Sequence, residues 1–498
     1  MSLNAQSEKI TLVYCGEKGG YLHIPLSILY LGESLIQHGF KPKLVDLRIK
    51  EISEEDIHGA LFMGVSHMTG SMQIPGALKC AEIAKSMNIS TVFGGTHPSI
   101  LLEQTAVHPL VDVAVKGEGE RIVVELAEYF QGKRSLESVK GIAYKSSSGK
   151  IVFTGDAEPP VFDQISHLPY ELLPMDSYLA TSADFGYQSS RGCPHRCAFC
   201  AEISLYNRKW RAKPPAVVVE EIKKIIEQFN PKRICFVDSN FFCKKERIEE
   251  FCKLIIENGI KINFFAECRF DYFSKYDTGF INLIKQAGFN EIEFGGESGS
   301  NVTLTYINKD INSEQIIKSI EKCKHAGLRS FTSFMIGFPN ESDEEMHKTL
   351  NMIDRISSID PDRSRINGLF IYSPFPGTKL YDIVVNQFGF VPPKSLETWG
   401  RFELYDSSNL IWHNEKKKVQ LSVISILVRF FFVHKTLSGW SFSEKTNRHG
   451  GTLKALASII FNGFLYPIAK LRWKLRCFEF GYEWKLWQKI FYIYMGRK

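Results

Sequence analysis

RGCPHRCAFC, residues 191–200, places Cys193, Cys197 and Cys200 in a C-x3-C-x2-C array. Three thiolates on one tight loop can each hold one iron of a [4Fe-4S] cluster and leave the fourth iron open for a small-molecule ligand, whereas a structural zinc ion needs four protein ligands. His195 lies inside the loop, where it is an awkward fourth zinc ligand. The array predicts an iron–sulfur cluster with one open position; zinc binding or plain buried cysteines are the alternatives.

The residues around this loop alternate between strand and helix patterns. A clear helix is expected at 217–229, and a later helix opens with an S-x-x-E capping box at Ser342 and Glu345. The expected strands are 186–190, 233–238, 262–267, 291–294, 330–335 and 368–373. Six βα steps without the last two of a full barrel predict an open (β/α)6 partial barrel over 181–390, with its chemistry at the C-terminal ends of the strands.

A separate alternation precedes the barrel. Strands are expected at 10–15, 43–46, 60–66, 90–95 and 111–115, with helices at 25–38 and 75–87. This order predicts a Rossmann-like, doubly wound α/β domain over 1–135. The turn-rich residues 136–180 are expected to be a linker with at most one small hairpin.

The C-terminal residues differ in charge. Residues 411–498 hold 16 Lys and Arg against 4 Asp and Glu, a local charge of +12, so the rest of the chain carries 45 against 51, or −6. We expect a mainly helical, basic and aromatic domain over 391–498. It could contact a membrane surface, cover a hydrophobic or anionic substrate, or pack on the barrel as an ordinary helical domain.

The location of the protein is predicted from what the sequence lacks. No apolar run is long and uncharged enough for a transmembrane helix, and the N-terminus has no signal-peptide pattern. The 11 cysteines are odd in number and widely spread, which argues against a disulfide framework. We therefore expect a cytoplasmic protein, peripheral to the membrane if the basic tail binds there.

With Phe199 before its last cysteine, the array resembles the C-x3-C-x-aromatic-C signature of the radical S-adenosylmethionine (SAM) superfamily. The resemblance implies that the open iron binds SAM and that reductive cleavage gives a 5′-deoxyadenosyl radical, with a reductase or flavodoxin as electron donor. Further similar stretches are VDSNF (237–241), EFGGESGS (293–300) and FMIGFPNES (334–342). The SAM-binding residues implied in this way are Phe199, Asp238, Arg269, Glu297, Ser298 and Gly337; each could also be a turn glycine or a solvated charge at a strand end.

The N-terminal unit resembles the cobalamin-binding domain of a large radical SAM subfamily. The similar stretches include GVSHMTGSMQI (64–74), GGTHPSI (94–100) and VKGEGE (115–120). The implied cobalamin-binding residues are Ser66, His67, Thr69, Gly94, Gly95, His97, Pro98, Gly117 and Glu118. The D-x-H-x-x-G motif of other cobalamin proteins is absent after the first strand, so cobalamin should bind base-off, without that histidine ligand. A Rossmann-like adaptor without cobalamin is the alternative.

Together these features predict a cobalamin-dependent radical SAM methyltransferase that acts on an unactivated carbon of a small-molecule, lipid or peptide substrate. The alternative with the same cofactors is a cyclase or oxidative rearrangement enzyme that resembles the anaerobic oxidative cyclase of chlorophyll synthesis. A sensor without turnover is a third hypothesis. Nucleic acid is not expected as a partner, because the related tRNA methylthiotransferases carry extra N-terminal cluster cysteines, and only Cys15 and Cys80 precede the barrel here.

Overall fold

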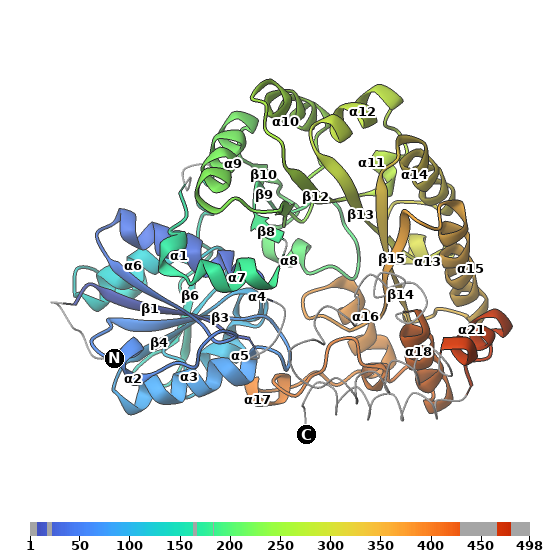
Figure 1. Cartoon of the computed structure of the whole chain (residues 1–498). Coiled ribbons are helices and arrows are strands. Elements are labelled where there is room, and N and C mark those ends of the chain that lie inside the picture. The colour runs from blue at the N-terminus through green and yellow to red at the C-terminus, as the bar shows by residue number, and fades with distance from the viewer. Residues whose placement is uncertain (1–6, 17–21, 163–166, 183, 429–465, 480–498) are drawn as a thin grey trace, which may run out of the picture.

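The computed structural model describes residues 7–16, 22–162, 167–182, 184–428 and 466–479. These residues form two α/β units that lie side by side, one in blue and cyan and the other from green to brown (Figure 1). A seven-stranded sheet organises the first unit and a six-stranded parallel sheet the second. The expected α/β class, with a doubly wound unit followed by a partial barrel, is confirmed.

The first sheet has the strand order β2-β1-β3-β4-β5-β6-β7, and its first five strands are parallel. They are β1 (Lys9–Tyr14), β2 (Lys41–Asp46), β3 (Phe62–Ser66), β4 (Ser90–Gly94) and β5 (Val113–Val115). The helices between them are α1 (Leu26–Gln37), α2 (Glu54–Ile57), α3 (Ile74–Ser86), α4 (Thr96–Ile100) and α5 (Leu102–Ala106), and α6 (Glu120–Phe130) follows β5. The order reverses between β1 and β3, which creates a crevice for ligands at the C-terminal ends of these two strands.

Residues 136–180, expected to be a linker, contain several helices and strands. The expected hairpin is present as β6 (Ile142–Lys145) and β7 (Ile151–Phe153), and it extends the first sheet in antiparallel fashion. The same segment contains the 3-10 turn η1 (Leu136–Ser138) before the hairpin and, after it, the 3-10 turn η3 (Tyr170–Leu172) and the start of the helix α7 (Met175–Thr181). Tyr178 of α7 donates a hydrogen bond of 2.7 Å to Asp46 at the end of β2, so this segment is anchored to the first unit.

The second sheet follows chain order, and all its neighbouring strands are parallel. Its strands are β8 (Asp184–Tyr187), β11 (Arg233–Phe236), β12 (Asn263–Cys268), β13 (Phe289–Glu297), β14 (Arg329–Ile336) and β15 (Ser364–Ile371). The longer helices are α9 (Pro215–Phe229), α10 (Lys245–Glu257), α12 (Thr278–Gln286), α14 (Ser313–Ala326), α15 (Asp343–Ile359) and α16 (Lys379–Phe388). The short ones are α8 (Glu202–Tyr206), α11 (Phe270–Phe273) and α13 (Asn301–Tyr306). The capping box at Ser342 and Glu345 opens α15 as predicted.

The described part of the C-terminal region packs on both units. It contains α17 (Leu396–Trp399), η4 (Ser407–Asn409), α18 (Glu415–Val428) and α21 (Tyr466–Leu475). Trp399 is fully buried and its ring lies 5.8 Å from that of His97 in the first unit, while Trp412 Nε1 donates to the carbonyl of Gly337 in the barrel. The rest of the expected basic helical domain, residues 429–465 and 480–498, lies outside the described residues.

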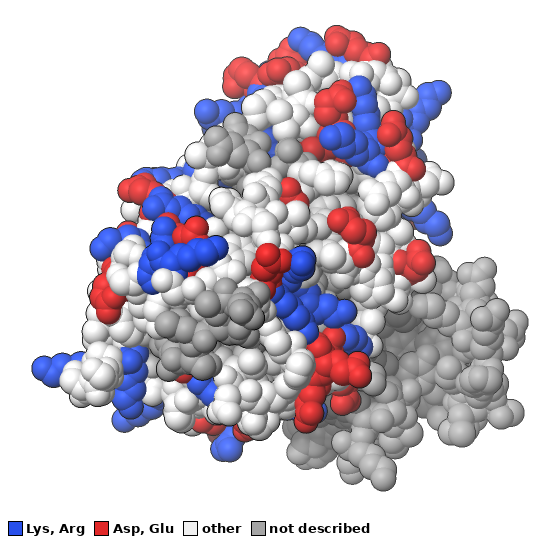
Figure 2. Space-filling model, turned by 90° about the vertical axis from the view of Figure 1, so that its left-hand side faces the viewer, with Lys and Arg blue, Asp and Glu red and all other residues white. Residues whose placement is uncertain are grey.

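The helices and the surface charge relate to the predictions about membranes and nucleic acid. Among the described residues, no helix has the length and apolar character needed to cross a membrane. On the face shown in Figure 2, basic and acidic side chains are interspersed in small groups. That face therefore does not carry the continuous basic stripe by which nucleic-acid-binding surfaces are recognised.

Phe289 lies at the centre of the aromatic core between the barrel strands and α10. Its ring lies within 6.3 Å of five other phenylalanine rings: Phe236, Phe241, Phe242, Phe251 and Phe264. We expect Phe289→Ala to lower the free energy of unfolding by about 3–5 kcal/mol, because a buried aromatic ring leaves a cavity. Urea unfolding followed by circular dichroism measures this. The matched change Phe153→Ala, at a side chain 42% exposed on β7, should cost no more than about 0.5 kcal/mol, and equal losses would contradict this packing.

Candidate functional site

The cysteine array lies on a loop with a closed neck. We define residues 192–210 as the cluster loop; β9 (Ser190–Arg191) and β10 (Arg211–Ala212) pair in antiparallel fashion at its two ends. Gly192 begins the loop with φ of 78°, and a Cβ on it would lie 2.2 Å from the carbonyl oxygen of Lys209. Only glycine fits here, since both the backbone conformation and the close approach exclude a side chain.

Asp238 holds the residues between the first barrel strand and this neck. Its carboxylate accepts hydrogen bonds from the Ser189 amide at 2.7 Å and from the hydroxyls of Ser189 and Ser190 at 2.6 Å each. Barrel pairing of the first strand therefore stops at Tyr187, three residues before the expected end of that strand. Asp238 is buried and both of its oxygens are used inside the protein, so its predicted SAM contact stays a prediction while its positioning of the neck is directly visible.

Hydrogen-bond donors reach two of the three thiols. Asn240 Nδ2 lies 3.6 Å from Cys193 Sγ, and Arg269 Nη1 lies 3.7 Å from Cys197 Sγ. Burial raises the pKa of Cys193, and it raises that of Cys200 to about 12. Thiolates at these positions need a strong positive charge beside them, which iron would supply.

The donor set fits a cluster better than a single ion. Within the described ranges, no three His, Cys, Asp or Glu side chains gather as ligands of one metal ion. A cubane takes each thiolate on a different iron, so its ligands surround a larger object than one ion. Three thiols on one loop, with nitrogen donors next to the sulfurs, match the usual surroundings of such a cluster.

Three predicted SAM-binding residues meet around Lys309, a residue that was not itself predicted to belong to the site. Lys309 Nζ donates to Glu297 at 2.7 Å and lies 5.9 Å from the Phe199 ring centroid, and its carbonyl accepts from Arg269 at 2.5 Å. Lys309 is buried beside the cluster loop, and no motif in the sequence marks it. Asn240 was also missed, although it lies within the quoted VDSNF stretch.

The other two predicted SAM-binding residues are engaged elsewhere. Ser298 Oγ lies 3.0 Å from Thr349 Oγ1 and accepts from the Ser300 amide, which closes a buried turn. Gly337 has φ of 85°, and a Cβ on it would lie 2.8 Å from Leu410, so the C-terminal segment covers this turn. Their contacts with SAM stay predictions.

The inner face of the barrel carries carboxylates near the cluster loop. Glu267 on β12 and Glu293 on β13 alternate with the buried apolar residues of those strands, and Glu202 begins α8. Burial raises the pKa of all three, that of Glu267 to about 7 with the charge of Glu293 adding to the effect. None of the three forms an ion pair with any residue in the described parts of the chain.

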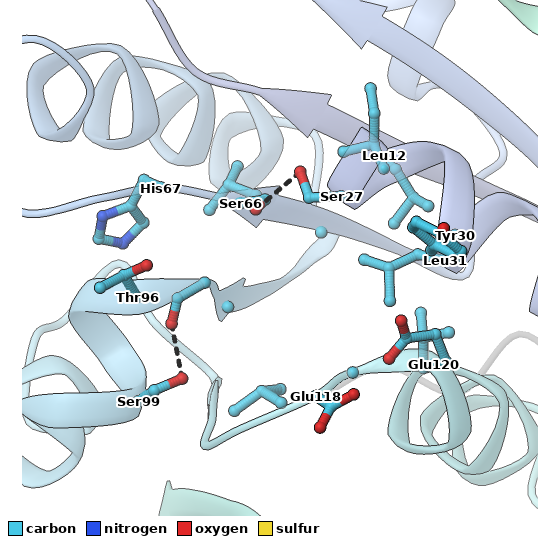
Figure 3. A pocket seen from close by; sticks show the side chains of 18 of the residues that line it. Leu12, Ser27, Tyr30, Leu31, Ser66, His67, Thr96, Ser99, Glu118 and Glu120 are labelled. Atoms are coloured by element: carbon cyan, nitrogen blue, oxygen red, sulfur yellow. Dashed lines mark hydrogen bonds between the residues drawn. The ribbon is translucent and has the colours of Figure 1, made fainter. Parts of the chain in front are cut away.

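A cavity of about 360 Å³ opens at the β1/β3 crevice of the first unit (Figure 3). Its deep part is apolar, with Leu12 and Leu31 among the wall residues, and its rim includes Ser27 and Ser66, whose hydroxyls lie 3.4 Å apart. Such a volume is typical of a small-molecule site. A Cβ on Gly117 would meet nothing within 4 Å, so the rim leaves open space for a ligand there.

Six of the nine predicted cobalamin-binding residues line this cavity, and three do not. The lining residues are Ser66, His67, Gly94, Gly95, Gly117 and Glu118. Thr69 and His97 lie behind it, with Thr69 Oγ1 and His97 Nδ1 3.1 Å apart, and Pro98 is buried in α4. The barrel also contributes to the walls, through Gln188 and Arg191. The cavity thus lies where the two units meet.

The two histidines predicted to bind cobalamin, His67 and His97, are buried. His67 and His97 are 1% and 0% exposed, their rings lie 5.4 Å apart, and the Nε2 atom of each is buried without a hydrogen-bond partner. Burial lowers the pKa of His67 to about 4 and that of His97 to about 3. Both rings are neutral parts of the core.

Two family models match the chain: the B12 binding domain at residues 14–127 and the radical SAM superfamily at residues 187–353. An uncharacterized methyltransferase of Pyrococcus horikoshii is 30% identical over 72% of this chain and 78% of its own. The anaerobic magnesium-protoporphyrin IX monomethyl ester cyclase of Rubrivivax gelatinosus is 25% identical over 88% of this chain and 79% of its own. The radical SAM methyltransferase TsrM of Kitasatospora setae, solved with cobalamin and a [4Fe-4S] cluster, superposes with a TM-score of 0.64 at 17% identity, covering 78% of this chain and 76% of TsrM.

Removing any one thiol of the array by a cysteine-to-alanine change should abolish cluster assembly. We expect Cys193→Ala, Cys197→Ala and Cys200→Ala each to retain little iron after anaerobic reconstitution, because two thiolates cannot hold the cubane in place. Cys243→Ala is the matched control, since Cys243 is close enough to Cys193 for their charges to interact but lies outside the array. Iron and sulfide per chain are measured. If Cys243→Ala lost its iron while the three array variants kept theirs, the assignment would be overturned.

The buried histidines should make stability depend on pH. An unfolded histidine takes up a proton near pH 6.5, while His67 and His97 resist it down to about pH 4 and 3. Their contribution is complete above pH 6.5 and is lost as the pH falls, by up to about 1.4 kcal/mol per pH unit for each. Unfolding at pH 7.0 and 5.0 should therefore show a smaller loss in the double variant His67→Leu, His97→Leu. Phe93→Leu, next to His67, should lower stability equally at both pH values.

Proposed function

The chain belongs to the cobalamin-binding radical SAM enzymes, and from this membership we propose that it is a methyltransferase that places a methyl group on an unactivated carbon of a small molecule. When bound, the cluster with SAM supplies a carbon-centred radical and methylcobalamin supplies the methyl group. The remaining task of the protein is to hold both sites against one substrate and to exclude water.

One observation carries the proposal: the wall of the cavity is shared by the two units. Glu118 of the first unit and Arg191 of the barrel both line it, and Arg191 lies two residues before Cys193. Methyl transfer to a substrate radical requires that the methyl donor and the radical source face the same substrate. A cavity at the crevice of the first unit, with the cluster loop as its neighbour, supports this arrangement.

The chain's own residues divide this work. Cys193, Cys197 and Cys200 would hold the cluster, with Asn240 and Arg269 donating toward the sulfurs. The apolar depth of the cavity would take the nucleotide tail of cobalamin, and the open space at Gly117 would let the macrocycle approach the backbone. Leu410 and Trp412 cover the turn at Gly337 and keep water from that end of the barrel.

We further propose that cobalamin binds base-off and without a histidine ligand from this chain. The burial of the two rings supports this, because His97 does not line the cavity and His67, which does, is only 1% exposed. Both ring nitrogens of His23 have partners, because Nδ1 lies 3.0 Å from Arg48 Nη1 and Nε2 lies 2.9 Å from the Tyr14 hydroxyl. An electron donor such as a flavodoxin would reduce the cluster.

A cyclisation or oxidative rearrangement is the second candidate. It is favoured by the similarity to the Rubrivivax cyclase, which extends over 88% of this chain. The two candidates share the cavity, the cluster loop and the carboxylates on the inner face of the barrel. They differ in their products.

The product balance tests the proposal. We expect the reconstituted, cobalamin-loaded enzyme to release S-adenosylhomocysteine together with 5′-deoxyadenosine when it turns over, because one SAM provides the radical and another the methyl group. Liquid chromatography with mass spectrometry measures both, and Cys197→Ala is the control that should release neither. Turnover that gives 5′-deoxyadenosine without S-adenosylhomocysteine would favour the cyclase. Protein expressed with ample cobalamin that contains no corrinoid would overturn both candidates.

A further inference from the structure

Glu118 binds both ends of the cluster loop at once. Its Oε2 accepts from Arg191 at 2.7 Å, and its Oε1 accepts from Arg211. These two arginines are partners in the β9–β10 neck, where Arg191 and Arg211 pair directly. One carboxylate on the cavity wall therefore holds the entry and the exit of the loop that carries the three cysteines.

Arg191 is fixed on its other sides as well. Its guanidinium lies 4.5 Å from the ring centroids of Tyr30 and Phe162, which are themselves in contact, and a second carboxylate, Glu120, lies 2.6 Å from Nη1. The side chains of Arg191, Glu118 and Glu120 are 6%, 10% and 6% exposed. Removing one partner from such a buried network leaves an uncompensated charge, so the network holds a single arrangement.

The residues of this network adjoin both cofactor sites along the chain. Glu118 follows Gly117, whose φ of 84° and open surroundings form the rim of the cavity. Arg191 precedes Gly192 and Cys193, and Gly192 is packed against the Lys209 carbonyl. A ligand that presses on residues 117–118 therefore acts on the neck of the cluster loop through two ion pairs.

We propose that Glu118, Arg191 and Arg211 form a clamp that couples the occupancy of the two sites, so that cobalamin in the cavity and the cluster on its loop each strengthen the binding of the other. The proposal rests on the proposed function in one respect, the binding of cobalamin in this cavity. These three are positioning residues, because they act through the loop and the rim. The coupling is reciprocal: whatever factor the cluster adds to cobalamin affinity, cobalamin adds to cluster retention.

Titration of the full-length chain with hydroxocobalamin, before and after anaerobic reconstitution of the cluster, tests the clamp. We expect the wild-type dissociation constant to fall by a factor of about 5 or more on reconstitution, the lower range of measured couplings between sites. In Arg211→Met this ratio should fall close to 1, because the exit of the loop is released from Glu118. Arg211 does not line the cavity and is not one of the cysteines, so the variant does not remove a direct contact with cobalamin.

Two matched variants separate coupling from general damage. Lys209→Met removes the same charge two residues before Arg211, at an exposed side chain that forms no ion pair within the described residues, and it should keep the wild-type ratio. Arg211→Lys keeps a positive charge opposite Glu118 but loses the donation of Arg211 Nη1 to the Pro160 carbonyl, and it should give an intermediate ratio. Thermal melting of each apoprotein verifies that the variants are folded.

The outcomes distinguish the clamp from the proposed function. A wild-type ratio of 1, or an unchanged ratio in folded Arg211→Met, would overturn the clamp while methyl transfer could still be observed. The reciprocal measurement, iron loss to a chelator with and without hydroxocobalamin, should show the same ordering of variants. Failure of the wild-type chain to bind hydroxocobalamin at all would overturn the clamp and the proposed function together.

Discussion

The cluster loop can present three cysteines together only because its neck is closed and its middle is tied to the barrel. The Ala198 amide donates to the Ile307 carbonyl at 2.8 Å, and the Ala198 carbonyl accepts from the Leu380 amide at 2.9 Å. Fixing each loop residue costs about 1–2 kcal/mol of backbone entropy, so the loop needs such anchors. Barrel elements far apart in the sequence supply them, and the site depends on the whole barrel being folded.

The barrel strands serve two purposes through the alternation of their side chains, which a bulge on β13 shifts by one residue. On β12, Phe264 packs in the aromatic core, and Glu267, three residues later, points to the opposite, inner face. On β13 a bulge after Phe289 shifts the register by one residue, so Glu293 pairs with Glu267 on the inner face although it lies four residues after the core residue Phe289. Successive side chains of a strand face opposite sides, so one backbone supplies both stability and a polar surface. Burial raises the pKa values of the carboxylates on the inner face. The packing energy of the aromatic layer behind them offsets the free-energy cost of burying these groups.

The sequence predicted most of what depends on local pattern. Strand periodicity located all eleven expected strands within a few residues, and Ser342 with Glu345 identified the start of α15. It did not predict contacts between distant residues. Asp238, a predicted SAM contact, also anchors Ser189 and Ser190, and Glu118, a predicted cobalamin contact, also pairs with Arg191 and Arg211; neither set of partners was predicted. A single charged residue at a strand end does not reveal its partner, because that partner is chosen by tertiary packing.

The position of Glu118 follows from the topology of the first sheet. With the order β2-β1-β3-β4-β5, the crevice lies at the C-terminal ends of β1 and β3, and the loop after β5 forms its rim. Parallel strands in the barrel likewise put their functional loops at the C-terminal ends, and the cluster loop follows the first of them. When two parallel sheets meet at these ends, their binding loops become neighbours without any special adaptation. Charged residues at the contact, such as Glu118 and Arg191, then have only to pair, and the pairing fixes the distance between the two sites.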